Sequence, residues 1–362
     1  MTSALRELVS GWAALAQATS QLPTLLTRDY WSNSVLESVG GHHFVGIAQG
    51  MFGPRKSTND RRVDGGMTVR AERRPVGLDP RSLAAAFPEA AGSLVVLLHG
   101  LVETEQGWFR GSKPGGDFGA RLADDLGSTP VYVRYNSGRH VSENGDELVA
   151  LLSRLVAAWP VPVTEVVLIG HSMGGLVARS ALYRAQEQDV PWLSLVTRLV
   201  CLGTPHAGAP LERRVAQLTT LLGKTPLTTP LTKLFALRSD GIQDLAHGYV
   251  HRRQWAGDPE LPGEAEPFPS NGIRRLFLSA TVSRREGSVW GRLIGDLLVT
   301  PVAADELIED AEVVWLGGLN HFALLRDAVV YQTLLAWLRE AEVTASSTGT
   351  GRVDPAKPRL PG

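Results

Sequence analysis

The sequence predicts an α/β protein whose central sheet is mostly parallel and is covered by helices on both faces. Short apolar runs recur along the chain, with helix-compatible segments between them. Strands that are buried on both faces need such runs, and parallel strands need crossover connections of this length. The expected strands are 94–98, 131–135, 166–169, 199–202, 276–279 and 312–316, and a closing helix is expected at 327–338.

The chain divides into three expected segments. Residues 81–343 form the core, residues 1–80 a helical extension or arm packed on it, and residues 344–362 a disordered tail. Within residues 3–19, apolar side chains at helical spacing predict a helix that packs on the core, because its polar face lacks the basic residues of membrane-surface helices. The strand pattern lapses at about 211–271, which predicts an inserted cap; a disordered surface excursion is the alternative.

Composition excludes several classes of protein. Hydrophobic residues make up 43% of the 362 residues and charged residues 20%, which is typical of a globular chain. The formal net charge of −1 lacks the basic excess of nucleic-acid-binding proteins, so we expect a small, uncharged partner. Cys201 is the single cysteine and lies in an apolar run, which predicts a buried thiol and excludes an intramolecular disulfide.

The N-terminal residues show no targeting signal. They lack the basic region, the apolar core and the cleavage site of a secretory peptide, so we expect a cytoplasmic protein. No window approaches the roughly 18 consecutive apolar residues of a membrane-spanning helix. Peripheral contact with a membrane and the oligomeric state both stay open.

A candidate nucleophile stands where the third expected strand ends. An apolar run at 167–169 leads into Gly-His-Ser-Met-Gly at 170–174, and a helix-compatible segment follows. Glycines permit the sharp strand-to-helix turn that exposes a serine hydroxyl. The pentapeptide alone occurs often by chance, but the strand before it and the helix after it predict that Ser172 is a nucleophile.

The base that Ser172 requires is sought among the four histidines that follow it, because in this architecture the chain order is Ser, acid, His. His321 is the best candidate, since it follows the last expected strand in a glycine-containing loop. His206 follows another strand but precedes every candidate acid, so we expect it to line the pocket. His247 and His251 lie four residues apart in the cap; without further ligands, we expect solvated side chains and no metal site.

Asp296 is the candidate acid. It follows the penultimate expected strand and precedes His321 by a suitable interval for one intervening helix. A residue directly at a strand end can reach the far nitrogen of the imidazole. Four nearby carboxylates, at 305, 306, 309 and 310, are alternatives whose usual role is helix capping or solvation.

An oxyanion hole needs two main-chain N–H groups aimed at one point. Met173, at the start of the helix after the nucleophile, is one candidate. Leu101 is the other, because it follows His99 and Gly100 at the end of the first expected core strand. We expect His99 to brace this loop by hydrogen bonding rather than to transfer a proton.

Further candidate pocket residues lie close to the nucleophile and in the tract 135–145. His171 precedes Ser172 directly, and Asn136 and Arg139 follow the second expected core strand. The tract also has an architectural interpretation, in which Arg139 pairs with a local carboxylate and Ser142 caps the next helix.

Taken together, these motifs resemble the α/β-hydrolase superfamily, in particular bacterial lipase-like serine esterases and inositol-deacylase-like relatives. The resemblance covers roughly residues 92–336 and implies the α/β-hydrolase fold with an inserted cap. The motifs that carry it are His99-Gly100-Leu101 with Trp108, 134–140, 170–174, 202–206, 295–299 and 320–322.

The predicted function is that of a serine carboxylester hydrolase, a lipase or esterase that works through an acyl-enzyme and needs no metal or organic cofactor. Apolar residues between 221 and 235 in the cap favour an apolar acyl chain, although lipid, simple ester and polyester substrates stay open. Two alternatives remain: acyl transfer to an alcohol on the same triad, and a catalytically silent protein that binds lipids or a partner.

Overall fold

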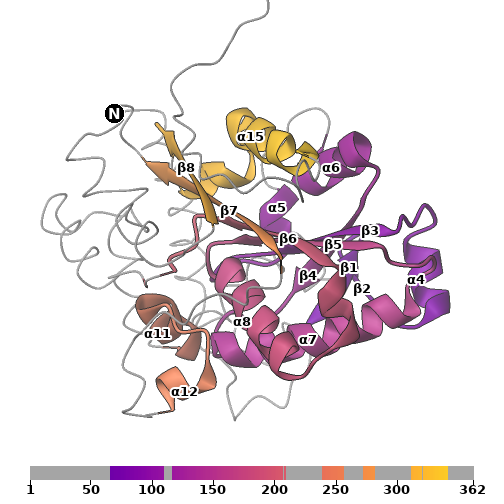
Figure 1. Cartoon of the computed structure of the whole chain (residues 1–362), viewed down its shortest axis with the longest axis horizontal. Coiled ribbons are helices and arrows are strands. Elements are labelled where there is room, and N and C mark those ends of the chain that lie inside the picture. The colour runs from indigo at the N-terminus through magenta and orange to yellow at the C-terminus, as the bar shows by residue number, and fades with distance from the viewer. Residues whose placement is uncertain are drawn as a thin grey trace, which may run out of the picture.

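The computed structural model describes residues 66–109, 116–206, 208, 239–256, 272–281, 311–319 and 321–340. These residues form an eight-stranded sheet with the strand order β2-β1-β4-β3-β5-β6-β7-β8 (Figure 1). Neighbours from β4 to β8 pair in parallel, and β1 pairs antiparallel with β2 and β4. The strands are β1 (Thr68–Ala71), β2 (Arg74–Val76), β3 (Ser93–Leu98), β4 (Thr129–Arg134), β5 (Glu165–His171), β6 (Val196–Leu202), β7 (Arg274–Thr281) and β8 (Ala311–Gly317).

Helices cover both faces of this sheet. In Figure 1, α7 and α8 lie on one face, and α5, α6 and α15 lie on the other. Within the described ranges, no helix is long and apolar enough to cross a membrane. The helices are α4 (Pro80–Ala86), α5 (Gln106–Phe109), α6 (Phe118–Leu126), α7 (Val141–Ala158), α8 (Met173–Glu187), α11 (Asp240–His247), α12 (Arg252–Trp255) and α15 (Ala328–Arg339), with 3-10 turns η2 (Pro191–Leu195) and η3 (His321–Leu325).

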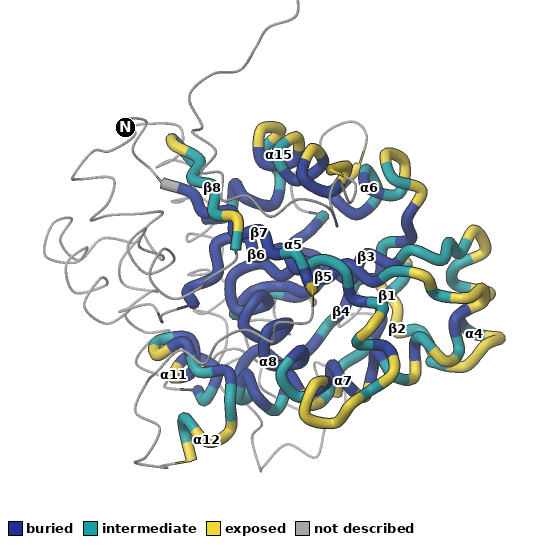
Figure 2. Tube along the Cα trace, in the orientation of Figure 1, coloured by how far each residue is buried: buried dark blue, intermediate teal, exposed yellow. Residues whose placement is uncertain are grey.

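The two helix layers explain the unbroken apolar runs of the sequence. Leu94, Val96 and Leu98 of β3 belong to the core cluster on the α7 and α8 face. Val95 and Leu97 belong to the cluster on the α6 and α15 face. Because successive side chains of a strand point to opposite faces, a strand covered on both sides must be apolar throughout, and Figure 2 shows the central strands buried.

The mostly parallel α/β sheet is confirmed. All six strands expected from the sequence are present as β3 to β8, and the closing helix is present as α15. The β1–β2 hairpin was not expected, because its turn carries no glycine or asparagine. Glu72 and Arg73 adopt left-handed backbone angles there, with φ of 48° and 67°, where hairpins usually place those residues.

Part of the cap lies among the described residues. Helix α11 begins against the loop before α7, where the Gly241 N–H donates to the Gly138 carbonyl (3.2 Å). A Cβ on Gly241 would lie 2.1 Å from the Ser137 carbonyl oxygen and 3.0 Å from the terminal methyl of Met173. The start of α11 therefore rests directly on the start of α8. The rest of the cap, the tail 344–362 and residues 1–65 lie outside the described residues.

A buried carboxylate fixes the cap to the first turn of α7. Asp244 accepts hydrogen bonds from the Val141 N–H (2.7 Å) and from Nδ1 of His140 (3.1 Å). The His140 ring in turn stacks on Trp255, with centroids 3.6 Å apart. Burial raises the pKa of Asp244 to about 6, although His140 and the Val141 N–H act in the opposite direction.

This raised pKa predicts a pH-dependent stability. Between pH 4 and 6 the folded chain binds more protons at Asp244 than the unfolded chain, so the free energy of unfolding falls as pH rises through this window. The change should amount to about 3 kcal/mol and should be absent in Asp244→Asn. Chemical denaturation at a series of pH values measures it, because titrations of groups that do not contact Asp244 cancel in the difference between the two proteins. Asp124→Asn, at an exposed carboxylate of α6, is the control, and parallel curves for parent and Asp244→Asn would contradict the prediction.

Candidate active site

Ser172 occupies a strained turn between β5 and α8. Its backbone angles are φ 52° and ψ −121°, a conformation that costs a non-glycine residue about 1–3 kcal/mol. Hydrogen bonds to its main chain from β6 and the loop after β6 hold it there. The Ser172 N–H donates to the Leu202 carbonyl (2.8 Å), and the Thr204 hydroxyl donates to the Ser172 carbonyl (2.9 Å).

The glycines on either side allow main chains to approach more closely than any side chain permits. A Cβ on Gly170 would lie 2.3 Å from the Gly175 nitrogen. A Cβ on Gly174 would lie 2.6 Å from the Leu98 carbonyl oxygen at the end of β3. Residues 170–174, the elbow, therefore turn sharply enough to present Ser172 where β3 and β5 end. The chain passes from β3 to β4 on one side and returns to β5 on the other, the usual place for a ligand site in an open sheet.

Residues 99–105, the His-Gly loop, lie against the elbow. A Cβ on Gly100 would be 3.1 Å from the Ser172 Cβ. The buried His99 ring accepts a hydrogen bond at Nε2 from the Tyr135 N–H (3.2 Å), so Nδ1 carries the proton and donates to the Gly100 carbonyl (2.9 Å). Burial lowers the pKa of His99 to about 4, which keeps the ring neutral at pH 7. Its contacts hold the loop and occupy both ring nitrogens.

The predicted oxyanion donors, Leu101 and Met173, directly follow Gly100 and Ser172, the two residues that approach each other closely here. Leu101 follows Gly100, and the next N–H, that of Val102, donates to the Ser137 hydroxyl (3.1 Å). Met173 is fully buried at the first position of α8, where main-chain N–H groups have no acceptor within the helix.

His321 reaches the same end of the sheet from the chain beyond β8. It is the first residue of η3 and is 2% exposed. Its ring lies 4.8 Å from the His171 ring, centroid to centroid, and a Cβ on Gly203 would lie 3.0 Å from its Nδ1. Gly203 directly follows Leu202, which accepts the Ser172 N–H. The ends of β5, β6 and β8 thus bring Ser172 and His321 to the same end of the sheet.

The remaining candidate residues divide between the site and the scaffold. Asp296 lies outside the described residues, so its role stays a prediction. His206 is buried against Phe277, with ring centroids 4.3 Å apart, and burial holds its pKa well below the ordinary value. Asn136 accepts the Gly138 N–H (3.0 Å) through its side chain and so shapes its own turn.

Arg139 and Ser142 form structural contacts at the start of α7. Arg139 pairs with Glu143 (3.1 Å) and with Glu147. The N-cap of α7 is His140, so the expectation that Ser142 caps this helix is wrong. Its hydroxyl instead accepts a hydrogen bond from the indole N–H of Trp255 in the cap (3.0 Å), a partner more than 100 residues away in sequence.

Two acidic residues of the His-Gly loop were missed by the sequence analysis. Glu103 accepts the Gly100 N–H (3.1 Å) and lies 3.1 Å from Nδ1 of His171. Glu105 forms two hydrogen bonds with Arg134 (2.6 and 2.5 Å). Burial alone would raise the pKa of Glu105, but Arg134 and the nearby Arg70 lower it to about 2. The available signal was two carboxylates in the loop that follows an apolar strand.

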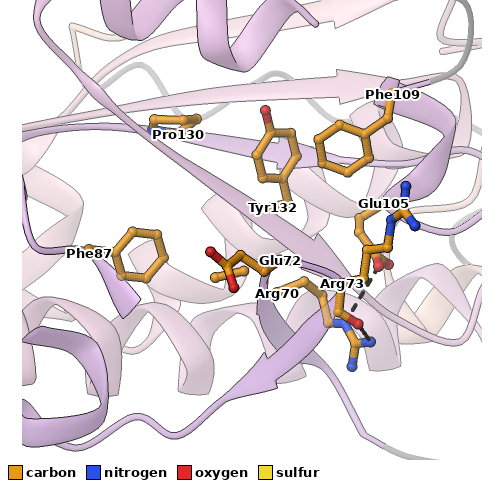
Figure 3. A pocket seen from close by; sticks show the side chains of 9 residues that line it. Arg70, Glu72, Arg73, Phe87, Glu105, Phe109, Pro130 and Tyr132 are labelled. Atoms are coloured by element: carbon orange, nitrogen blue, oxygen red, sulfur yellow. Dashed lines mark hydrogen bonds and ion pairs between the residues drawn. The ribbon is translucent and has the colours of Figure 1, made fainter. Parts of the chain in front are cut away.

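A separate cavity of about 390 Å³ lies at the β1 and β4 side of the sheet. Figure 3 shows its aromatic rings and its charged side chains, and neither Ser172 nor His321 lines it. In the described part of the chain, no group of three or more His, Cys, Asp or Glu side chains is arranged to hold a metal ion. The lining residues are Arg70, Ala71, Glu72, Arg73, Phe87, Glu105, Phe109, Pro130 and Tyr132.

Comparison with known proteins gives partial matches. A triacylglycerol lipase from Burkholderia plantarii is 32% identical over 136 residues, which cover 36% of this chain and 34% of that protein. A GPI inositol-deacylase from Emericella nidulans is 45% identical over 49 residues, which cover 14% of this chain and 4% of that protein. The matches therefore span about a third of the lipase and a small fraction of the deacylase.

The match to a protein family covers the elbow. Among solved structures, mature Bacillus licheniformis lipase BlEst2 is 20% identical with a TM-score of 0.47, and the alignment covers 75% of this chain and 96% of that chain. Residues 136–257 match the family described as the PGAP1-like alpha/beta domain. Residues 136–257 thus match a PGAP1-like alpha/beta domain, and parts of the chain are distantly homologous to a triacylglycerol lipase and to a GPI inositol-deacylase.

Proposed function

We propose that this lipase- and esterase-like α/β hydrolase is a serine carboxylester hydrolase with Ser172 as its nucleophile. One observation carries the proposal: Ser172 is held at φ 52° on a strand–turn–helix elbow, at the end of the sheet that the buried His321 also reaches from beyond another strand. A fold gains no stability from such a conformation, and strained residues of this kind concentrate at catalytic sites.

In the proposed reaction, the Ser172 Oγ forms a bond to the ester carbonyl carbon while His321 accepts the hydroxyl proton. The oxyanion is bound by the N–H groups of Leu101 and Met173. The alcohol leaves with the proton from His321, and water then repeats the sequence to release the acid. Asp296 would orient the imidazole and stabilise its charged form.

The substrate class is a small ester with an apolar acyl chain. The homology to a triacylglycerol lipase supports an ester, and the neutral charge balance of the chain does not favour a highly charged substrate. The apolar cap residues at 221–235 would supply the acyl-binding surface.

Covalent labelling tests this proposal. A fluorophosphonate probe should form one adduct, located at Ser172 by peptide mass spectrometry, and turnover of p-nitrophenyl esters should rise with acyl length. Ser194→Ala removes an exposed serine that is only part of a surface turn, and it should leave labelling unchanged. A folded chain that stays unlabelled under conditions where a known serine esterase reacts would overturn the proposal.

A further inference from the structure

One buried carboxylate connects three parts of the candidate active site. Glu103 is 8% exposed on its side chain. It accepts the Gly100 N–H, next to the predicted oxyanion donor Leu101, and it lies 3.1 Å from Nδ1 of His171. On the far side of the same ring, Nε2 of His171 lies 3.3 Å from the main-chain carbonyl oxygen of His321. A continuous polar chain therefore runs from the His-Gly loop, past the elbow, to the predicted base.

The chemistry of these contacts bears on where the ring of His171 carries hydrogen. A carbonyl oxygen only accepts, so Nε2 of His171 must donate to His321. The Glu103 oxygen that faces Nδ1 also accepts the Gly100 N–H, which favours the ionised carboxylate. A ring with hydrogen on both nitrogens makes both contacts at once, and such an imidazolium would pair with the Glu103 carboxylate in a buried site.

The surrounding main chain is shaped around this pair. A Cβ on Gly100 would lie 3.0 Å from the Glu103 carboxylate and 3.1 Å from Nδ1 of His171. A Cβ on Gly107 would lie 3.3 Å from the carboxyl carbon of Glu103. Because burying an ion pair generally gives little net stability, its presence beside the elbow indicates a role in geometry.

We infer that Glu103 and His171 form a charged bridge that positions the oxyanion loop and the main chain of His321 relative to Ser172. The inference rests on the proposed function, because it names what holds that site in its reactive geometry. Neither side chain is assigned a proton transfer to substrate; both are positioning residues. Hydrogen bonds that involve a charged group are generally stronger than neutral ones, which suits a fixed spacing.

Glu103→Gln keeps the shape of the side chain and removes its charge. The kcat for a p-nitrophenyl ester should fall by about 10- to 100-fold with KM nearly unchanged, because oxyanion contacts strengthen in the transition state. Glu103→Asp, which retains the charge, should recover part of that loss. Glu187→Gln, at an exposed carboxylate at the end of α8, should leave both constants at the parental value.

Nitrogen-15 NMR of the histidine rings reports which ring nitrogens of His171 carry hydrogen, and this measurement needs no enzymatic turnover. At neutral pH, both ring nitrogens of His171 should carry hydrogen in the parent, and one should lose it in Glu103→Gln. A single-tautomer, neutral His171 in the parent would overturn the inference, even if the variant failed to fold. So would a folded Glu103→Gln with parental kcat. Absence of fluorophosphonate labelling in the parent would instead contradict the proposed function. The NMR result would still report whether Glu103 and His171 form a charged pair.

Discussion

Ser172→Ala should lose nearly all esterase activity, with a fall in kcat of about 10⁴- to 10⁶-fold. Alanine has no hydroxyl to form the acyl-enzyme, while the main-chain donors and the pocket remain for substrate binding. The variant should fold normally, because alanine meets the same backbone strain as serine and the hydrogen bonds described for residue 172 are made by its main chain. Initial rates and circular dichroism measure both outcomes.

A double variant separates a joint mechanism from independent effects. If Ser172 and His321 act as one unit, His321→Ala alone should cost nearly as much as Ser172→Ala, and combining the two should add little. Ser194→Ala supplies the control for loss of an unrelated hydroxyl. Parental turnover in Ser172→Ala would refute the assignment of the nucleophile.

The second large effect concerns folding: Gly170→Ala should destabilise the chain by about 3 kcal/mol or more. The added Cβ would meet main-chain atoms of Gly174 and Gly175 at 2.3–2.5 Å, and main chain cannot move aside as a flexible side chain can. Either β5 and α8 separate or the elbow distorts. The denaturation midpoint should fall, and any variant that does fold should also have low activity.

Gly127→Ala is the matched control for this experiment. Gly127 ends α6 at φ 65°, yet a Cβ there would have nothing within 4 Å. Its replacement therefore reports backbone strain alone and should cost about 1 kcal/mol. Equal losses at the two positions would show that close approach is not what requires glycine at 170.

Much of this architecture could be predicted because its determinants are local. The β3 run alternates between two helix layers, so it has to be apolar at every position, and that pattern is visible in the sequence. The turn at Ser172 is likewise indicated by the residues next to it in sequence, because an apolar strand precedes it and a helix follows it. Such signals need no knowledge of the chain's distant parts.

The features that escaped prediction depend on distant partners or on unusual turns. Glu103 meets His171 across 68 residues, and Asp244 meets His140 across 104. Nothing near any of these four residues in sequence indicates its partner. The β1–β2 hairpin escaped for another reason, because its left-handed turn is built from charged residues whose sequence does not suggest a turn.

The close seating of Gly241 has a consequence for protein engineering. With main chain from the loop before α7 on one side and Met173 on the other, position 241 tolerates no side chain without displacing α11. A different insertion grafted onto this scaffold to change selectivity would therefore need glycine at the position of Gly241, or residues 137–139 would have to be exchanged with it. Gly241 and residues 137–139 therefore have to be designed together with the inserted helices.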